Sequence, residues 1–268
     1  AFQRELGLDA EWLSARECRR LEPGLSPRVP GGILTPHESQ VDPAATVAAL
    51  AAAFERAGGE IRRGQAAEEL LHDGERVTGV RTAAGASVEA EHVLLAAGCW
   101  SGELAGVPPE ALPPVRPVKG QILSLRSRGG ELLIRRMVHT PRCYVVARPD
   151  GRVVIGATVE ERGFDTAVTA EGVYRLLEAA WEVLPDIGEL EFAGAQTGLR
   201  PGTPDNAPVI GAAGPEGLLI ATGHYRNGVL LAPITAEAIA ALAAGAEPPV
   251  QVAPFSPSRF AAVGGGAA

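Results

Sequence analysis

Segments with helical and with strand-like hydrophobic spacing alternate along this chain, and this alternation limits the fold more than any other feature. Apolar residues repeat with the period of a helix over residues 43–57, 170–184 and 229–244. The first of these stretches begins at Asp42-Pro43, an N-cap followed by proline at the first helical position, and ends at Gly58-Gly59. Because short apolar runs typical of strands separate the helices, the sequence predicts a mixed α/β (α+β) fold.

The region after the first helix has the pattern of an α/β layer. Residues 60–62 predict a short strand, and residues 66–72 and 76–82 predict a hairpin with a turn at Asp73-Gly74. Residues 92–97 form a continuous apolar run, which is typical of a buried strand in a parallel sheet.

The middle of the chain predicts a mostly antiparallel sheet. Strand-like runs cover residues 120–126, 132–139, 143–148 and 152–157, and Asp150-Gly151 suits a tight turn between the last two. Thr169 is the expected N-cap of the helix over 170–184, Pro185 ends it, and we expect this helix to pack on the sheet.

The last third adds strands near 190–197 and 217–222, a loop over 201–208 and the third helix. We therefore expect a discontinuous domain made of residues 1–114 and 198–247, interrupted by an inserted domain over residues 115–197. Residues 248–268 form a tail that we expect to fray.

Composition excludes several classes of function. The net charge of −8 and the scattered arginines argue against a nucleic-acid partner. The most apolar stretch, Val229 to Ala244, contains Pro233 and Glu237 and is shorter than the ~20 residues of a membrane span.

The cysteines and the first residue indicate the setting of the protein. Cys18, Cys99 and Cys143 lie far apart and have no His at metal-ligand spacing, so we expect neither a metal site nor a disulfide framework, and a reducing cytoplasm fits best. Because residue 1 is Ala and the only methionine is Met137, we expect the gene to begin upstream of this sequence.

Three positions stand out as candidates for binding or chemistry. Arg200 comes at the expected end of a strand, before Pro201-Gly202, where its fork could bind a carboxylate. From spacing alone, an exposed arginine or one that pins a loop is at least as common. Tyr144 begins an expected strand, where its hydroxyl could donate to the same carboxylate or its ring could simply fill the core.

The third candidate is the loop over residues 223–228, between an apolar strand and an apolar helix. Its backbone N–H groups gather at a helix N-terminus, which suits an anion or an electron-rich ring. The alternative is an ordinary loop in which His224 and Asn227 serve only as caps. The sequence contains no motif of a serine hydrolase, a zinc protease or a P-loop, and Cys143 has no evident His partner.

Six motifs, taken together and in order, resemble the D-amino-acid oxidase superfamily, and within it the glycine oxidases of thiamine biosynthesis. They are VDP at 41–43, AAGCWS at 96–101, PVKGQIL at 117–123, CYVVARPDGRVVIGATVE at 143–160, GLRPGTPDNAPVIG at 198–211 and GHYRNGVLLAP at 223–233. The resemblance implies an FAD-binding domain of the glutathione-reductase type, here incomplete, with an inserted antiparallel substrate domain.

The resemblance also implies roles for individual residues. Arg200 would hold the substrate carboxylate, Tyr144 would be a second donor, and Arg226 would line the pocket near the flavin. Ala67 would contact FAD through its backbone. The residues that would wrap the isoalloxazine ring are His224, Tyr225, Arg226, Asn227, Gly228, Val229 and Leu230.

The implied reaction is the oxidation of glycine or a small amino acid by O₂, which yields glyoxylate or another 2-oxo acid, ammonia and hydrogen peroxide. Two departures bear on this expectation. Gln196-Thr197 stands where relatives often carry an aromatic residue, which puts the pocket's shape in question, and the GxGxxG turn that binds the ADP half of FAD is absent from these residues.

The alternatives are a relative of the sarcosine oxidases or D-amino-acid dehydrogenases, and a non-catalytic module that binds carboxylates without flavin. The resemblance further implies a homo-oligomer, commonly a tetramer.

Overall fold

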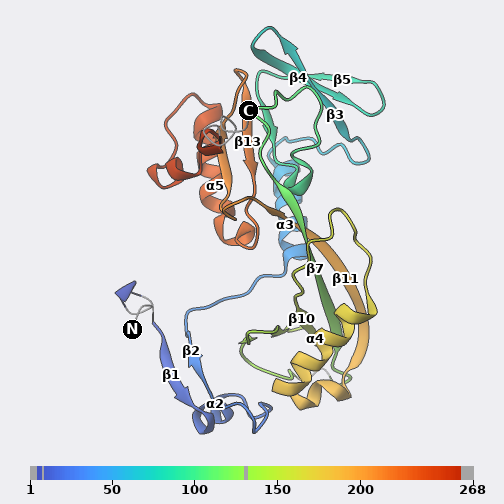
Figure 1. Ribbon diagram of the computed structural model, residues 1–268, viewed down its shortest axis with the longest axis vertical. Helices are drawn as coiled ribbons and strands as arrows, with labels where there is room; N and C mark the ends of the chain where they lie inside the picture. Colours follow the sequence, from blue (N-terminus) through green and yellow to red (C-terminus); the bar gives the residue numbers. More distant parts are fainter. Residues whose placement is uncertain (1–4, 8, 130–131, 261–268) are drawn as a thin grey trace, which may run out of the picture. The chain divides into compact units, whose positions relative to one another are not determined.

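The computed structural model describes residues 5–7, 9–129 and 132–260 (Figure 1). It divides into two compact units. Unit 1 comprises Ala1–Val41, Lys119–Glu160 and Asp165–Gly198, and unit 2 comprises Asp42–Val118, Glu161–Phe164 and Leu199–Ala268. The expected assignment of these regions to a flavin domain and a substrate domain stays a prediction.

Unit 1 is built on a five-stranded sheet with the strand order β11-β7-β10-β9-β8. The strands are β7 (Arg116–Arg126), β8 (Val138–His139), β9 (Tyr144–Ala147), β10 (Arg152–Gly156) and β11 (Glu191–Gly202). β10 pairs antiparallel with both β7 and β9, and β9 pairs antiparallel with β8. Gly151 has φ +82° in the turn between β9 and β10, as Asp150-Gly151 predicts. The antiparallel sheet and the mixed α/β class are confirmed.

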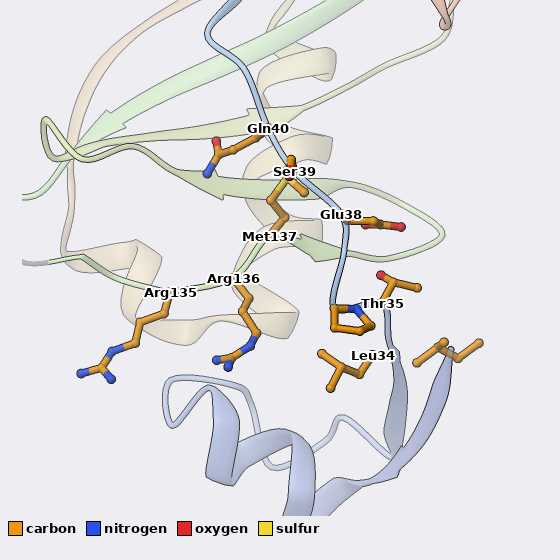
Figure 2. A pocket seen from close by; sticks show the side chains of 10 residues that line it. Leu34, Thr35, Glu38, Ser39, Gln40, Arg135, Arg136 and Met137 are labelled. Atoms are coloured by element: carbon orange, nitrogen blue, oxygen red, sulfur yellow. The ribbon is translucent and has the colours of Figure 1, made fainter. Parts of the chain in front are cut away.

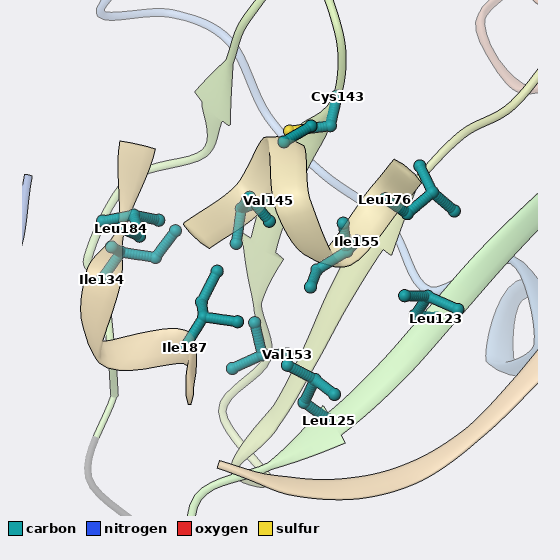
Figure 3. Packing of buried hydrophobic residues seen from close by; sticks show 12 residues of the cluster. Leu123, Leu125, Ile134, Cys143, Val145, Val153, Ile155, Leu176, Leu184 and Ile187 are labelled. Atoms are coloured by element: carbon teal, nitrogen blue, oxygen red, sulfur yellow. The ribbon is translucent and has the colours of Figure 1, made fainter. Parts of the chain in front are cut away.

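Helix α4 (Ala170–Val183) packs on this sheet and closes the core of unit 1 (Figure 3). Thr169 caps the helix by accepting a hydrogen bond from Gly172 N, and Pro185 begins a 3₁₀ turn, η2 (Pro185–Glu189), as the sequence predicts. The buried side chains from both elements are Leu123, Leu125, Val145, Val153, Ile155, Leu176, Ala179 and Ala180. This contact between sheet and helix is the main apolar interface of the unit.

Unit 1 also contains a small element that the sequence analysis missed. β1 (Glu11–Ser14) and β2 (Gly31–Leu34) pair antiparallel, and α2 (Ala15–Leu21) lies between them in the chain. Ser14 and Glu17 form a capping box at the start of α2. The spacing Ser-x-x-Glu at these positions was the sequence signal for this helix.

Unit 2 contains two three-stranded sheets. In one sheet, β13 (Leu218–Thr222) lies between β12 (Val209–Ala212) and β6 (Val93–Leu95), and it runs parallel to β6, which confirms the predicted parallel pairing. The other sheet has β4 (Arg76–Thr82) between β3 (Ala67–Asp73) and β5 (Ser87–Glu89), which confirms the predicted hairpin.

Two helices complete unit 2. α5 (Gly228–Ala243) packs Ala238 and Ile239 against the β12–β13 sheet. α3 (Pro43–Arg56) begins at Asp42, whose carboxylate accepts hydrogen bonds from two first-turn N–H groups, and it buries none of its residues.

Three expectations are wrong in detail. Residues 60–62 form no strand, because they pair with no neighbouring strand of the described residues. Of 132–139, only Val138 and His139 join the sheet; Arg135 N donates instead to the Glu22 carboxylate at 3.0 Å. The described part of the tail is packed rather than frayed, since Val252 is buried against α5 and the β12–β13 sheet. Residues 261–268 lie outside the described part.

The core of unit 1 leads to a stability prediction. Leu123 is fully buried between the sheet and α4. We expect Leu123→Ala to lower the free energy of unfolding by roughly 2–5 kcal/mol, because it removes buried methyl groups and leaves a cavity. Leu123→Met, which conserves volume, is the matched control and should cost less than about 1.5 kcal/mol. Urea denaturation measures both values, and equal effects of the two variants would contradict this account.

Candidate functional site

The residues expected to form the site belong to both units. Tyr144 lies in unit 1, whereas Ala67, Arg200 and residues 223–230 lie in unit 2. Each part is therefore described within its own unit.

Arg200 lies within β11 and is partly buried. The strand continues to Gly202, so the expectation that it ends before Pro201 is wrong by two residues. The turn that follows is held tightly. The hydroxyl of Thr203, a fully buried residue, donates to Ala207 O at 2.8 Å, and Arg116 Nη1 donates to Thr203 O at 2.6 Å. The strand that carries Arg200 thus leads into a rigid turn.

An ion pair fixes the other side of this turn. Arg259 Nε lies 3.1 Å from an Asp205 carboxylate oxygen and holds the pKa of Asp205 at about 2. Arg259 also donates to Ala207 O at 2.9 Å. The described part of the C-terminal segment therefore stabilises the turn next to Arg200.

The loop between β13 and α5 is attached to the same strand. Tyr225 N donates a hydrogen bond to Pro201 O at 3.0 Å, one residue past Arg200. Gly223 has φ +73°, and a Cβ there would lie 2.6 Å from Thr203 Cγ2, so only glycine allows this close approach. Tyr225 itself has φ +48°, which is rare for a residue with a side chain. The structure thus brings the GLRPGT and GHYRNG motifs together.

The N-terminus of α5 is open at this loop. The Asn227 side chain makes no capping hydrogen bond, which contradicts the alternative that it serves as a cap. The first turn contains no acidic residue, and Gly228, Val229 and Leu230 are exposed. N–H groups and a positive helix end therefore face outward, an arrangement that suits an electron-rich ring. By this criterion, the loop and the first turn of α5 fit the isoalloxazine end of FAD.

The tautomer and the protonation state of His224 are both fixed beside this helix end. Its Nε2 lies 2.9 Å from Thr235 Oγ1, and the Thr235 hydroxyl donates to Leu231 O at 2.8 Å. Because that hydroxyl hydrogen is already used, we infer that His224 Nε2 is the donor to Thr235. Burial lowers the pKa of His224, so the ring is neutral at pH 7.

Tyr144 is the first residue of β9 and pairs with Gly156 across the sheet. Its ring covers Gly156 so closely that a Cβ at that position would collide with the phenol. The His139 ring lies 5.9 Å away, centroid to centroid. Ala67 is exposed at the start of β3, opposite Thr82.

A separate cavity of about 210 Å³ lies in unit 1 (Figure 2). Its lining residues come from the segments 33–40 and 135–137. Gln40 Nε2 donates to Ala147 O at 3.2 Å, and Arg136 turns toward α2, where it pairs with Glu22 at 3.3 Å. None of the predicted site residues lines this cavity.

Two buried polar residues of the PVKGQIL motif, Lys119 and Gln121, were not expected to have a role. The sequence does single out Lys119, because it is the only lysine of the chain.

The buried cysteines are unreactive. Cys99 and Cys143 are buried, and burial raises the pKa of each, which favours the unreactive thiol form.

Among the described residues, no helix combines the length and the apolar composition that crossing a bilayer requires. Within the same residues, no three side chains of His, Cys, Asp or Glu form a group that could hold a metal ion.

The buried state of His224 leads to a pH prediction. Its pKa is lowered from the ordinary 6.5 in the folded chain, so below pH 6.5 the unfolded chain takes up a proton first. Stability from His224 is therefore fully present above pH 6.5 and is lost as the pH falls through the folded pKa. We expect wild type to lose stability relative to His224→Gln over this range, as measured by urea midpoints. His92→Gln, at an exposed position, is the matched control, and parallel profiles of wild type and His224→Gln would contradict the assignment.

Comparisons with known proteins agree with the fold. Residues 1–242 match the family described as FAD dependent oxidoreductase (DAO). The bifunctional protein ThiO/ThiG of Synechocystis is 36% identical over 255 residues, which are 94% of this chain and 38% of that protein. The hydrogen cyanide synthase subunit HcnC of Pseudomonas aeruginosa is 34% identical over 95% of this chain and 61% of its own length. The solved glycine oxidase from Geobacillus kaustophilus has a TM-score of 0.89 and 34% identity, covering 96% of this chain and 69% of that one.

These matches confirm the resemblance to the D-amino-acid oxidase superfamily, its fold class and FAD as the cofactor of the family. This chain spans less than two thirds of the length of the two curated relatives named above. With nearly all of its residues matched, the chain belongs to the family of FAD dependent oxidoreductases.

Proposed function

We propose that this chain belongs to an FAD-dependent oxidase that deaminates glycine or another small amino acid with O₂. One observation carries the proposal: the strand of Arg200 is attached through Pro201 to the loop at the open N-terminus of α5. The backbone of the Arg200 strand and the N-terminus of α5 are thus neighbours within unit 2, and in this proposal Arg200 supplies the cation that binds the carboxylate.

The substrate would be oriented by arginine. In the proposed site, Arg200 binds the carboxylate and Arg226 lines the pocket. The resemblance gives Tyr144 the role of a second donor to the carboxylate. Each charge-assisted hydrogen bond contributes about 1.5–3 kcal/mol, and their directions fix the α-carbon of the amino acid. Positioning of this kind is the main contribution of the polypeptide, and no side chain needs to act as acid or base.

The flavin end would be held by backbone and apolar groups. His224, Tyr225, Asn227 and the first turn of α5 wrap the ring, and Ala67 contacts FAD through its backbone. FAD bound there would supply the acceptor for a hydride from the α-carbon, with O₂ as the final electron acceptor. The positive N-terminal end of α5 would favour negative charge on a ring held at this place.

The biological setting follows from the relatives. The name of the ThiO/ThiG protein supports a place in thiamine biosynthesis, and the three free, buried cysteines suit the cytoplasm. We propose residues 1–114 and 198–247 as the flavin domain and residues 115–197 as the substrate domain. A homo-oligomer, for which the family resemblance implies a tetramer, completes the proposal.

Two alternatives remain distinct from this function. The first is a relative of the sarcosine oxidases or D-amino-acid dehydrogenases, which would differ in the amine and in the electron acceptor; the similarity to a hydrogen cyanide synthase subunit, HcnC, is the reason to test it. A non-catalytic module would bind carboxylates without flavin.

The first test is a visible spectrum of the purified complete protein, followed by anaerobic addition of glycine. We expect flavin absorbance that bleaches with glycine and returns with O₂, with hydrogen peroxide as a product. Bleaching by sarcosine or D-alanine alone would replace glycine as the substrate. A colourless protein that still binds glycine would identify the non-catalytic module.

The second test concerns Arg200. We expect Arg200→Ala to raise the glycine KM by about 10-fold or more while flavin content is kept, because the variant loses the carboxylate partner but not the cofactor loop. The glycine KM of Arg200→Lys should lie between those of wild type and Arg200→Ala, since lysine keeps the charge but not the planar fork of the guanidinium. Arg81→Ala, at a surface ion pair of unit 2, is the control. Lost flavin with an unchanged KM would show that Arg200 serves the cofactor instead.

A further inference from the structure

The single lysine of the chain is fully buried. Lys119 lies on β7 in unit 1, and its Nζ is 2.8 Å from Asp165 Oδ2. Asp165 remains 46% exposed. Burying an ammonium group costs free energy that its partners must offset. The burial of the lysine at position 119 therefore calls for a structural explanation. The remaining 23 cationic side chains are all arginines.

Two residues further along β7, a second polar side chain is buried beside the same loop. Gln121 Nε2 donates to Glu160 Oε1 at 2.7 Å and to Thr169 Oγ1 at 3.0 Å. Its Oε1 accepts from Thr169 N at 2.9 Å. A Cβ at Gly172 would collide with this amide, so the first turn of α4 packs directly on Gln121. All the hydrogen-bonding atoms of the amide therefore act on the segment between β10 and α4.

Together these two residues hold both ends and the middle of residues 157–169. At the first end the contacts come from the backbone: Gln121 N donates to Thr158 Oγ1 at 2.8 Å, and Lys119 N donates to Glu160 O at 2.9 Å. The Lys119–Asp165 ion pair holds the middle, where Asp165 Oδ1 also accepts from Ala167 N at 2.8 Å. A segment with no strand or helix of its own is thus fixed by buried groups on one strand.

This segment begins beside Tyr144. Gly156, the last residue of β10, is covered by the Tyr144 phenol, and residue 157 follows at once. A change in the backbone at residue 157 acts through the peptide bond on Gly156, the residue against which the phenol rests. At the other side, the Thr197 hydroxyl bonds to Thr166 O, so the segment also contacts β11 three residues before Arg200.

We propose that Lys119 and Gln121 form a bracket that positions residues 157–169, and through them the Tyr144 hydroxyl, for binding the substrate carboxylate. This inference rests on the role proposed above for Tyr144. Lys119 and Gln121 are positioning residues, since they act through the segment rather than by touching the substrate. Lysine suits the place because its compact ammonium needs one small buried pocket, whereas the guanidinium of arginine presents a wide planar fork.

The test uses Asp165→Asn in the complete flavin-loaded protein. The variant keeps the size of the side chain and its bond to Ala167 N, but it removes the charge opposite Lys119. We expect faster hydrogen exchange in residues 157–169 and a glycine KM raised about tenfold, with kcat changed less than about twofold. Asp165→Glu restores the charge and should return the KM to within about threefold of wild type.

The matched control is Asp150→Asn, which breaks the surface pair between Asp150 and Arg152 at the opposite end of β10. It should leave both hydrogen exchange in residues 157–169 and the KM unchanged. Unchanged exchange in Asp165→Asn would overturn the bracket. Faster exchange with an unchanged KM would overturn its link to the substrate. A wild-type protein that does not oxidise any amine would instead refute the proposed function, and the inference with it, while the exchange data would still report on the bracket.

Discussion

The hydrogen bond from Tyr225 N to Pro201 O is the contact on which the candidate site depends. It joins the strand of Arg200 to the loop that opens α5, although the two bonded residues are more than twenty positions apart in the sequence. Glycine at position 223 makes the approach possible, and the buried Thr203 lies directly beneath it. Because backbone and buried groups make these contacts, exposed side chains such as Arg226 and Leu230 are left free for ligands.

In unit 1, buried polar side chains hold a segment in place. Its core is an ordinary apolar interface between one sheet face and α4. The side of β7 that carries Leu123 and Leu125 in this core carries Gln121 and Lys119 at the end of the core. These two buried polar side chains hold a segment without regular structure. Fully paired polar networks of this kind fix one arrangement where apolar packing alone would permit several.

Most elements with strong local signals were predicted from the sequence. Asp42-Pro43 and Thr169 begin helices because capping is decided by neighbouring residues, and Asp150-Gly151 makes the expected turn. Errors occurred where distant partners decide the outcome. Residues 60–62 have strand-like composition but no paired neighbour among the described residues, and the backbone near Arg135 bonds to Glu22 instead of a strand. The described part of the tail is packed because Val252 and Arg259 contact residues far away in the chain.

The sequence by itself determined the fold class, the family resemblance and the residue types of the site, because caps, turns and motifs are local or are preserved as ordered runs. Only the tertiary structure decided that the Arg200 strand and the α5 loop meet, that Asn227 does not cap its helix, and that His224 is held neutral by burial. It also decided that the single lysine is buried against Asp165. Burial and pairing between distant segments depend on how strands and helices pack, and no local pattern encodes those distances.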